Sequence, residues 1–312
     1  MRPTLAILFV FAAGLYAQDI TVAARSPRDL VEFVQNHHDF DWEPLWNFSA
    51  VSEYGPFLPH CSQTFSGVSA CTADLLPVPD SEQIIVVLEH RESSFHVFLR
   101  YQKTAAGDWR ITGSYTPVVR YFRPEYRLYQ LGEKPFLILS EQGISGAGVS
   151  SELEDWFDLS RELFLPVLTF TRHGRYSPWP SGIGREVHST VVSVEAQPVE
   201  QITLNLDAAF EFTAKDGATL PLFHRTDRMV LTRNAAGDFT AHGPDAFYDI
   251  QDDPEPGPAA FLRFAWQSLA EIAANPADKR FPWLTAYLKT CPDIPESRRL
   301  KAALYNSPIR RK

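Results

Sequence analysis

The sequence is poor in the features that mark nucleic-acid-binding proteins and zinc-ribbon proteins. It has only three cysteines, none of them in a CxxC spacing, which disfavours a zinc-ribbon or thioredoxin-like site. Positive charge is also scarce, since the formal net charge is −9. Binding to nucleic acid requires a basic face that displaces counterions from phosphates. We therefore expect no nucleic-acid partner and no electrostatic docking on an anionic membrane.

The sequence also lacks a recognisable nucleotide-binding or nucleophile motif. Its glycine-rich stretch, GISGAG at 143–148, follows an apolar run but has no GKS or GKT ending and no GxGxxG spacing. A GxSxG nucleophile turn fails because Ala147 occupies the last glycine position. The residues after it alternate like a strand, whereas both motifs require a helix there. The stretch predicts a hairpin, and no cofactor can be named from the sequence.

Long apolar runs are absent except at the N-terminus. Leu5–Ala13 is an unbroken apolar run, preceded by Arg2 and followed by the small residue Ala17. This order is typical of a secretory signal peptide at residues 1–17, and the run is too short for a membrane-spanning helix, which needs about 20 residues. A buried N-terminal helix or strand is the alternative. We expect an exported protein, periplasmic or secreted, that begins near Gln18 and does not insert into the membrane.

Export changes the interpretation of the cysteines, because an oxidising compartment favours disulfides. Cys61 and Cys71 lie close together in a stretch rich in serine, glycine and threonine. The spacing predicts a Cys61–Cys71 bridge and leaves Cys291 unpaired. A bridge from Cys291 to either upstream cysteine remains the alternative.

Hydrophobic residues make up 45% of the chain and aromatic residues 13%, which is enough for a real core. Amphipathic spacing and capping residues predict helices at 26–36, 259–274, 283–289 and 296–305. Between them, apolar runs and alternating patterns separated by turn residues predict an antiparallel sheet. The expected strands are 84–88, 95–101, 110–115, 126–131, 136–139, 149–155, 165–171, 187–195, 202–212 and 229–232.

The predicted fold class is α+β, with a large, mostly antiparallel sheet and with N-terminal and C-terminal helices packed on it. We expect one globular domain at 18–312, made of a helix and coil at 18–81, a sheet region at 82–248 and a helical end at 259–312. A β-propeller or a β-sandwich is the architectural alternative.

One short pattern recurs inside the sheet region. The sequence AAGDW at 105–109 is echoed by AAGDF at 235–239, each time after an apolar strand. Glycine can supply the positive φ of a hairpin turn there. An ancient duplication would explain this repeated sequence. The simpler explanation is that sequences which favour hairpin turns resemble one another.

A metal site is one candidate for chemistry. His37, His38, Asp39 and Asp41 combine imidazole and carboxylate, the ligands that suit zinc and other transition metals. The competing interpretation is a histidine-favouring helix C-terminus followed by an Asp-rich turn, because neighbouring residues rarely point to one centre.

Aromatic residues in turn-rich segments are the other candidate. Tyr176 and Trp179 lie in a stretch rich in proline and glycine, and Trp46 lies in an aromatic, proline-punctuated segment. Flat rings on loops bind sugars or peptide side chains at little entropic cost. The alternative is that such a tryptophan closes one end of the sheet.

The sequence alone does not establish a function. The hypothesis we favour is a non-catalytic exported protein that binds a small molecule, a glycan or a protein through its aromatic segments. The alternative is a hydrolase outside the cytoplasm, with a site assembled from dispersed residues such as His37, Asp39 or His60. The sequence does not decide whether the chain is an enzyme.

Overall fold

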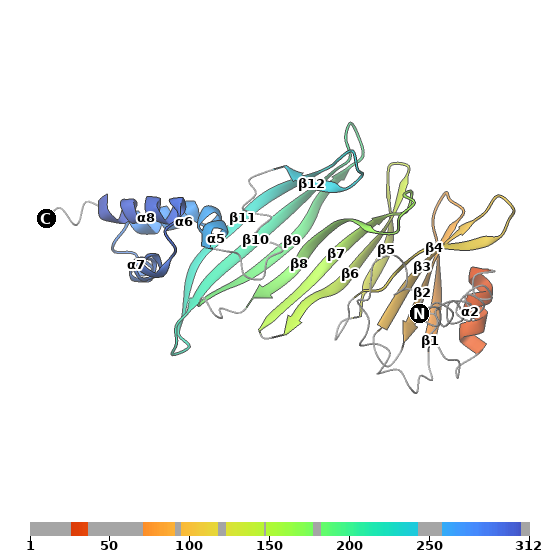
Figure 1. Ribbon diagram of the computed structural model, residues 1–312, viewed down its shortest axis with the longest axis horizontal. Coiled ribbons are helices and arrows are strands. Elements are labelled where there is room, and N and C mark those ends of the chain that lie inside the picture. The colour runs from red at the N-terminus through yellow and green to blue at the C-terminus, as the bar shows by residue number, and fades with distance from the viewer. Residues whose placement is uncertain are drawn as a thin grey trace, which may run out of the picture. The chain divides into compact units, whose positions relative to one another are not determined.

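The computed structural model describes residues 26–36, 71–90, 95–117, 123–146, 148–176, 182–242 and 258–306. They form an α+β fold of mostly antiparallel strands with a few helices, as the sequence predicts (Figure 1). The four-stranded sheet has the order β1-β2-β3-β4, and the eight-stranded sheet has the order β12-β11-β10-β9-β8-β7-β6-β5. The predicted single sheet region is therefore two sheets.

The structure contains every predicted strand, most of them longer than predicted, and two strands that were not predicted, β1 and β12. The strands are β1 (Cys71–Pro77), β2 (Gln83–His90), β3 (Phe95–Lys103), β4 (Trp109–Tyr115), β5 (Glu125–Leu131), β6 (Lys134–Gly146), β7 (Val149–Asp158), β8 (Pro166–Tyr176), β9 (Ile183–Glu195), β10 (Gln201–Thr213), β11 (Thr219–Arg233) and β12 (Phe239–His242). The helices are α2 (Pro27–Asn36), α5 (Pro258–Phe264), α6 (Trp266–Ala274), α7 (Phe281–Thr290) and α8 (Pro295–Asn306).

The described residues fall into two compact units. The first unit contains the described residues up to Gln142 together with Asp155–Val167. The second unit contains Gly143–Glu154 together with the described residues from Leu168 onward. The eight-stranded sheet contributes strands to both units because β6 and β7 each cross the boundary. The expectation of a single domain stays a prediction.

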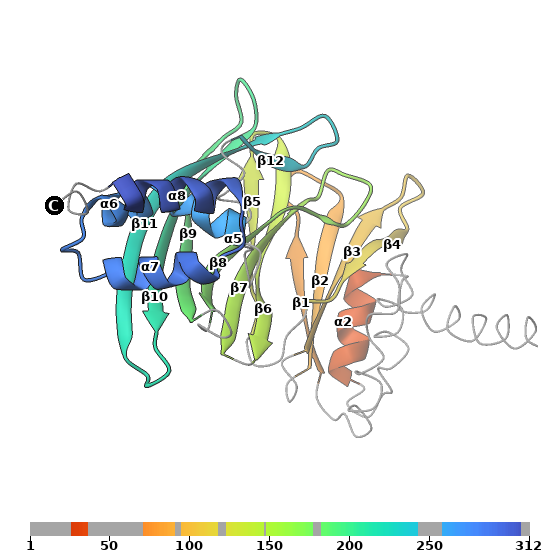
Figure 2. The same ribbon diagram turned by 60° about the vertical axis from the view of Figure 1, so that its left-hand side comes forward.

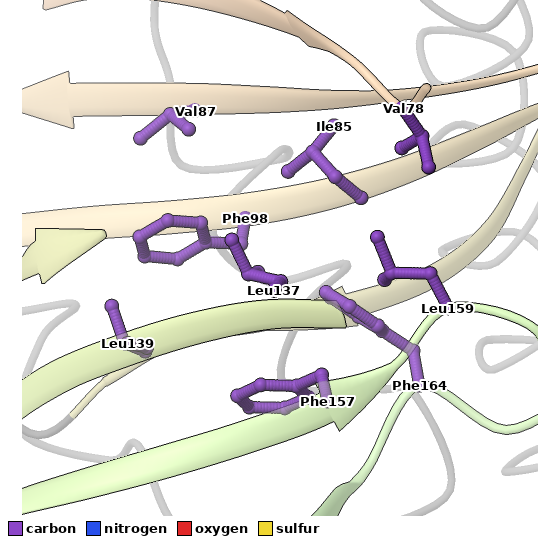
Figure 3. Close-up of a cluster of buried hydrophobic side chains, with 9 residues drawn as sticks. All are labelled: Val78, Ile85, Val87, Phe98, Leu137, Leu139, Phe157, Leu159 and Phe164. Carbon is purple, nitrogen blue, oxygen red and sulfur yellow. The ribbon is translucent and has the colours of Figure 1, made fainter. Parts of the chain in front are cut away.

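The core of the first unit lies between strands of the two sheets. Ile85 and Val87 of β2 and Phe98 of β3 meet Leu137 of β6 and Phe157 of β7 (Figure 3). Residues 84–88 of β2 form a continuous apolar run, as expected of a buried strand. Burial of this kind contributes about 1.5–3 kcal/mol for each large side chain. The core of the first unit is therefore built between strands of two sheets rather than on one.

A buried arginine holds the connection after β7 in the first unit. Nη1 and Nη2 of Arg100 donate to the carbonyl oxygens of Arg161 and Glu162 at 2.6 and 2.7 Å, and its Nε donates to Oγ1 of Thr112 at 2.8 Å. Burial lowers the pKa of this guanidinium, and nearby Asp158 opposes that effect. The arginine therefore fixes a loop that delivers Phe164 to the core.

In the second unit, helices α5–α8 cover one face of the sheet over β9–β11 (Figure 2). The strand β10 shows why that face is covered, because its buried positions alternate from Ile202 to Phe210 along the strand. Leu269, Ile272 and Leu284 bury the matching side of the helices. The predicted packing of the C-terminal helices on the sheet is confirmed for α5, whose Phe261 and Phe264 rings contact Phe210 of β10.

Two local predictions need correction. Residues 259–274 were expected to form one helix, but they form α5 and α6, with Ala265 between them. The interruption is slight, since the N–H groups of Ala265 and Leu269 still bond four residues back, at 2.8 and 2.9 Å. The segment 71–77 was expected to be coil but forms β1, because its backbone groups are satisfied by pairing with β2.

The hairpin turns confirm the role of glycine. Gly107 and Gly237 have φ values of 89° and 88°, and Gly217 in a third turn has 85°. Each glycine N–H donates to the residue three positions earlier, at 2.9–3.0 Å. The same turn therefore forms at three places, and one of them lacks the AAGD sequence. This favours independent use of one turn type over an ancient duplication as the explanation of the repeated sequence.

No helix among the described residues is both long and apolar enough to cross a membrane.

Candidate functional site

A row of buried side chains crosses four neighbouring strands of the second unit. Tyr176 on β8 pairs with Arg185 on β9, Arg185 pairs with Phe210 on β10, and Phe210 pairs with Phe223 on β11. Residues that pair across antiparallel strands point to the same face. We call these four residues the helix-side row, because Phe210 and Phe223 contact α5.

Aromatic rings form an apolar wall beside this row. The rings of Phe210 and Phe223 stack with centroids 4.6 Å apart, and Phe264 of α5 lies 5.6 Å from Phe210. Phe261 lies 5.7 Å from the same ring. Such pairs contribute beyond their buried area and hold the rings in one arrangement. The wall is therefore rigid.

A pocket of about 1060 Å³ opens over the helix-side row. All four residues of the row line it, and residues 278–280 before α7 border it. Arg280 ties this border to the sheet, since its Nη1 donates to the carbonyl oxygen of Leu222 at 2.6 Å. Arg280 also donates from Nε and Nη2 to both carboxylate oxygens of Asp278, at 2.9 and 2.6 Å. These bonds lower the pKa of Asp278 to about 2.

Arg185 is the most unusual side chain in the pocket. It is only 5% exposed, and its guanidinium carbon lies 3.9 Å from the centre of the Tyr176 ring. Burying a cation is costly, and stacking on an aromatic face offsets part of that cost. Exposed Lys279 and Arg175 add positive charge to the lining, while the acids there are Glu186, Glu211 and Asp278. The pocket thus combines an aromatic wall with a buried cation.

The opposite face of the same strands carries a second polar group. His173 pairs with His188 across β8 and β9, and Glu186 lies two residues before His188. The Nε2 atoms of both histidines lie 3.4 Å from Oε1 of Glu186. The imidazole rings stack with centroids 4.4 Å apart. The group therefore combines two imidazoles and one carboxylate on one surface.

The first unit contains a buried carboxyl pair. The hydroxyl of Tyr115 lies 3.0 Å from Oε1 of Glu141 and 3.3 Å from Oδ2 of Asp155. Burial raises the pKa of Glu141 to about 8, and the neighbouring Asp155 adds to the effect. Burial, followed by the two acids, also raises the pKa of Tyr115. Perturbed pairs of this kind occur in active sites and in structural networks alike.

The structure places one of the predicted ligand-binding residues in the pocket. Tyr176 was expected on a loop, but it ends β8 and is buried against Arg185. Trp46 and Trp179 lie outside the described residues, as do the predicted metal ligands His37, His38, Asp39 and Asp41. Cys61 lies outside them too, so its bridge to Cys71 stays a prediction. Cys291 is a buried free cysteine.

Sequence reasoning missed Arg185, His173 and His188. His188 lies inside the predicted strand 187–195, whereas His173 and Arg185 lie two residues beyond the predicted strands 165–171 and 187–195. The missing information was the register, which decides which residues meet across strands.

Comparison of the chain with protein-family models, with curated proteins and with solved structures finds no match to any of them.

Proposed function

We propose that this chain is an exported ligand-binding protein whose helix-side pocket takes an organic anion with an aromatic or apolar body. The observation that carries the proposal is the stacking of buried Arg185 on Tyr176, at 3.9 Å, inside a pocket walled by phenylalanines. The proposed class of ligand is a small molecule that carries a carboxylate, sulfonate or phosphate group.

The charge of the ligand follows from the energetics of Arg185. An ionised side chain in a low-dielectric site gains strongly from a counter-charge that brings hydrogen-bond acceptors. Guanidinium groups match carboxylate and phosphate oxygens in two-point contacts. The pocket sits on a rigid sheet, so a bound anion would meet a cation that is already oriented. This preorganisation favours affinity.

The size and lining of the pocket support a small organic ligand. Ligand sites commonly enclose about 300–1,000 Å³ and combine apolar walls with a few oriented polar groups. The pocket volume of about 1060 Å³ is close to that range. The stacked pair Phe210–Phe223 offers a flat face, 4.6 Å between centroids, beside the cation. An aromatic anion would use both features together.

The proposal is tested with 1-anilinonaphthalene-8-sulfonate, an aromatic sulfonate that fluoresces in apolar surroundings. We expect saturable binding of one molecule to the mature chain. The Arg185→Met variant keeps the apolar stem and removes the charge, and we expect it to weaken binding at least tenfold, about 1.4 kcal/mol. Fluorescence titration measures the affinity, and circular dichroism at 25 °C checks that the variant is folded.

Two controls distinguish a specific anion site from non-specific hydrophobic binding. Arg298→Met removes an exposed arginine on α8 that pairs with Asp293, and we expect it to leave the affinity unchanged. N-phenyl-1-naphthylamine has a similar aromatic body without the sulfonate, so its binding should be indifferent to Arg185→Met. Equal affinity of the sulfonate for wild type and Arg185→Met contradicts the proposal.

Export is the second part of the proposal, and it is supported by the N-terminal apolar run with its flanking residues. We infer that residues 1–17 are removed and that the mature protein carries the Cys61–Cys71 bridge. Intact-mass analysis of the protein recovered outside the cytoplasm should give a chain beginning near Gln18 and lighter by two hydrogens. Recovery of an uncleaved chain inside the cytoplasm alone would contradict export, and peptide mapping would reveal any bridge made by Cys291.

A further inference from the structure

The face of the second unit's sheet opposite the helices gathers three histidines and two carboxylates. His173 pairs with His188, and His188 pairs with Asp207 on β10, so these residues form one cross-strand row. Glu186 lies two residues from His188, so it belongs to the next row on the same face. His224 belongs to that row too, because Glu186 and His224 both pair with Ala209 of β10. His224 Nε2 lies 2.5 Å from Oδ1 of Asp207. The side chains come from four adjacent strands.

Three of these side chains have the separations of metal ligands. The ligand atoms of His173, Glu186 and His188 all lie within 4.8 Å of one another. The two histidine-to-glutamate distances are both 3.4 Å. Around a tetrahedral zinc ion with bonds of 2.0–2.2 Å, neighbouring ligand atoms are roughly 3.3–3.5 Å apart. The two distances already match that separation.

The side chains have room for the remaining adjustment. The two rings are almost parallel, at 13°, so they must turn for both nitrogen lone pairs to meet at one ion. His173, Glu186 and His188 are 45%, 50% and 53% exposed, which leaves their rotamers free to change. Their backbones are held by the sheet.

We propose that His173, Glu186 and His188 bind a divalent transition-metal ion, with zinc as the expected ion. Imidazole nitrogen suits first-row transition metals, and a carboxylate completes a ligand set that zinc accepts. Three protein ligands leave a fourth position, which solvent occupies on this exposed surface. Asp207 pairs with His188 in register and contacts His224, so a further carboxylate lies on the strand next to the site.

Glu186 borders the organic-anion pocket as well as this site, but His173 and His188 are not among the residues that line that pocket. Arg185 points toward the helices, whereas Glu186, the next residue, points away from them. Loss of zinc binding in a variant of this face would leave Arg185 and its stacking on Tyr176 in place. The two proposals can therefore fail separately.

The test is calorimetric titration of the mature, tag-free full chain with zinc chloride after dialysis against a chelator. We expect binding that His188→Ala and Glu186→Gln each weaken at least tenfold, because each removes one of three ligands. Glu195→Gln is the matched control, since it removes an exposed carboxylate of β9 outside the ligand set, and should change the affinity less than threefold. Circular dichroism checks that each variant is folded.

A second variant separates this site from the histidine cluster predicted near the N-terminus. The double variant His37→Ala/His38→Ala should keep zinc binding at 173–188. Nitrogen-15 NMR of the imidazoles should show zinc-induced shifts at His173 and His188. The proposal is overturned if wild type binds no zinc, or if the double variant loses binding while His188→Ala and Glu186→Gln retain it.

Discussion

Replacement of Phe157 by alanine should lower the free energy of unfolding by about 3–5 kcal/mol, the range for truncating a buried phenylalanine. Phe157 is 0% exposed and lies in the cluster between the two sheets of the first unit. Its ring meets those of Tyr115 at 4.7 Å and Phe164 at 5.0 Å. Alanine would leave a cavity that two rigid sheets cannot close. Urea unfolding followed by circular dichroism measures the loss.

A control for this variant is available in the connection that follows β7. Leu163 is 48% exposed, so Leu163→Ala should change the free energy of unfolding by less than about 0.5 kcal/mol. A loss of under 1 kcal/mol for Phe157→Ala would mean that the two sheets do not pack through this residue. The comparison therefore tests the packing of the two sheets in the first unit.

The second large effect is a loss of stability as the pH rises, caused by Glu141. Its carboxyl is buried beside Asp155 and the Tyr115 hydroxyl, and burial raises its pKa from 4.5 to about 8. The folded state therefore holds a proton that the unfolded state releases above pH 4.5. By linkage, this stabilising contribution is fully present below about pH 4.5 and is lost as the pH rises through 8.

Urea unfolding at pH 5 and pH 9 measures this effect. We expect wild type to be less stable at pH 9 by about 2–4 kcal/mol, and Glu141→Gln to remove most of that difference. The amide keeps the shape of the carboxyl and does not titrate. Glu211→Gln, at an exposed position of β10, should keep the wild-type dependence. Equal stability of wild type at the two pH values would refute the assignment.

Local features of the fold could be predicted because they depend on neighbouring residues. The turns at Gly107 and Gly237 need only a glycine at positive φ, and both form as expected. Helices α7 and α8 begin and end within two residues of the predicted bounds because proline and apolar spacing mark them. In contrast, residues 219–228 of β11 were missed, since Pro221 and several charged residues obscure the alternation there.

The candidate sites could not be predicted in the same way because they depend on register. Arg185 meets Tyr176 and Phe210 only because β8, β9 and β10 pair at those positions. A shift of one residue would send Arg185 to the opposite face and bring Glu186 under the helices. No pattern within one strand records that choice. The same holds for His173 and His188, which lie fifteen residues apart.

The sequence by itself determined the fold class, most of the elements and the expectation of export, because periodicity, turn residues and an apolar leader are local properties of the chain. The tertiary structure alone decided that there are two sheets and that Arg185 stacks on Tyr176 in a pocket. It also decided that two histidines and Glu186 share the opposite face. The physical reason is that pairing between strands is non-local, so chemistry built across strands exists only once their register is set.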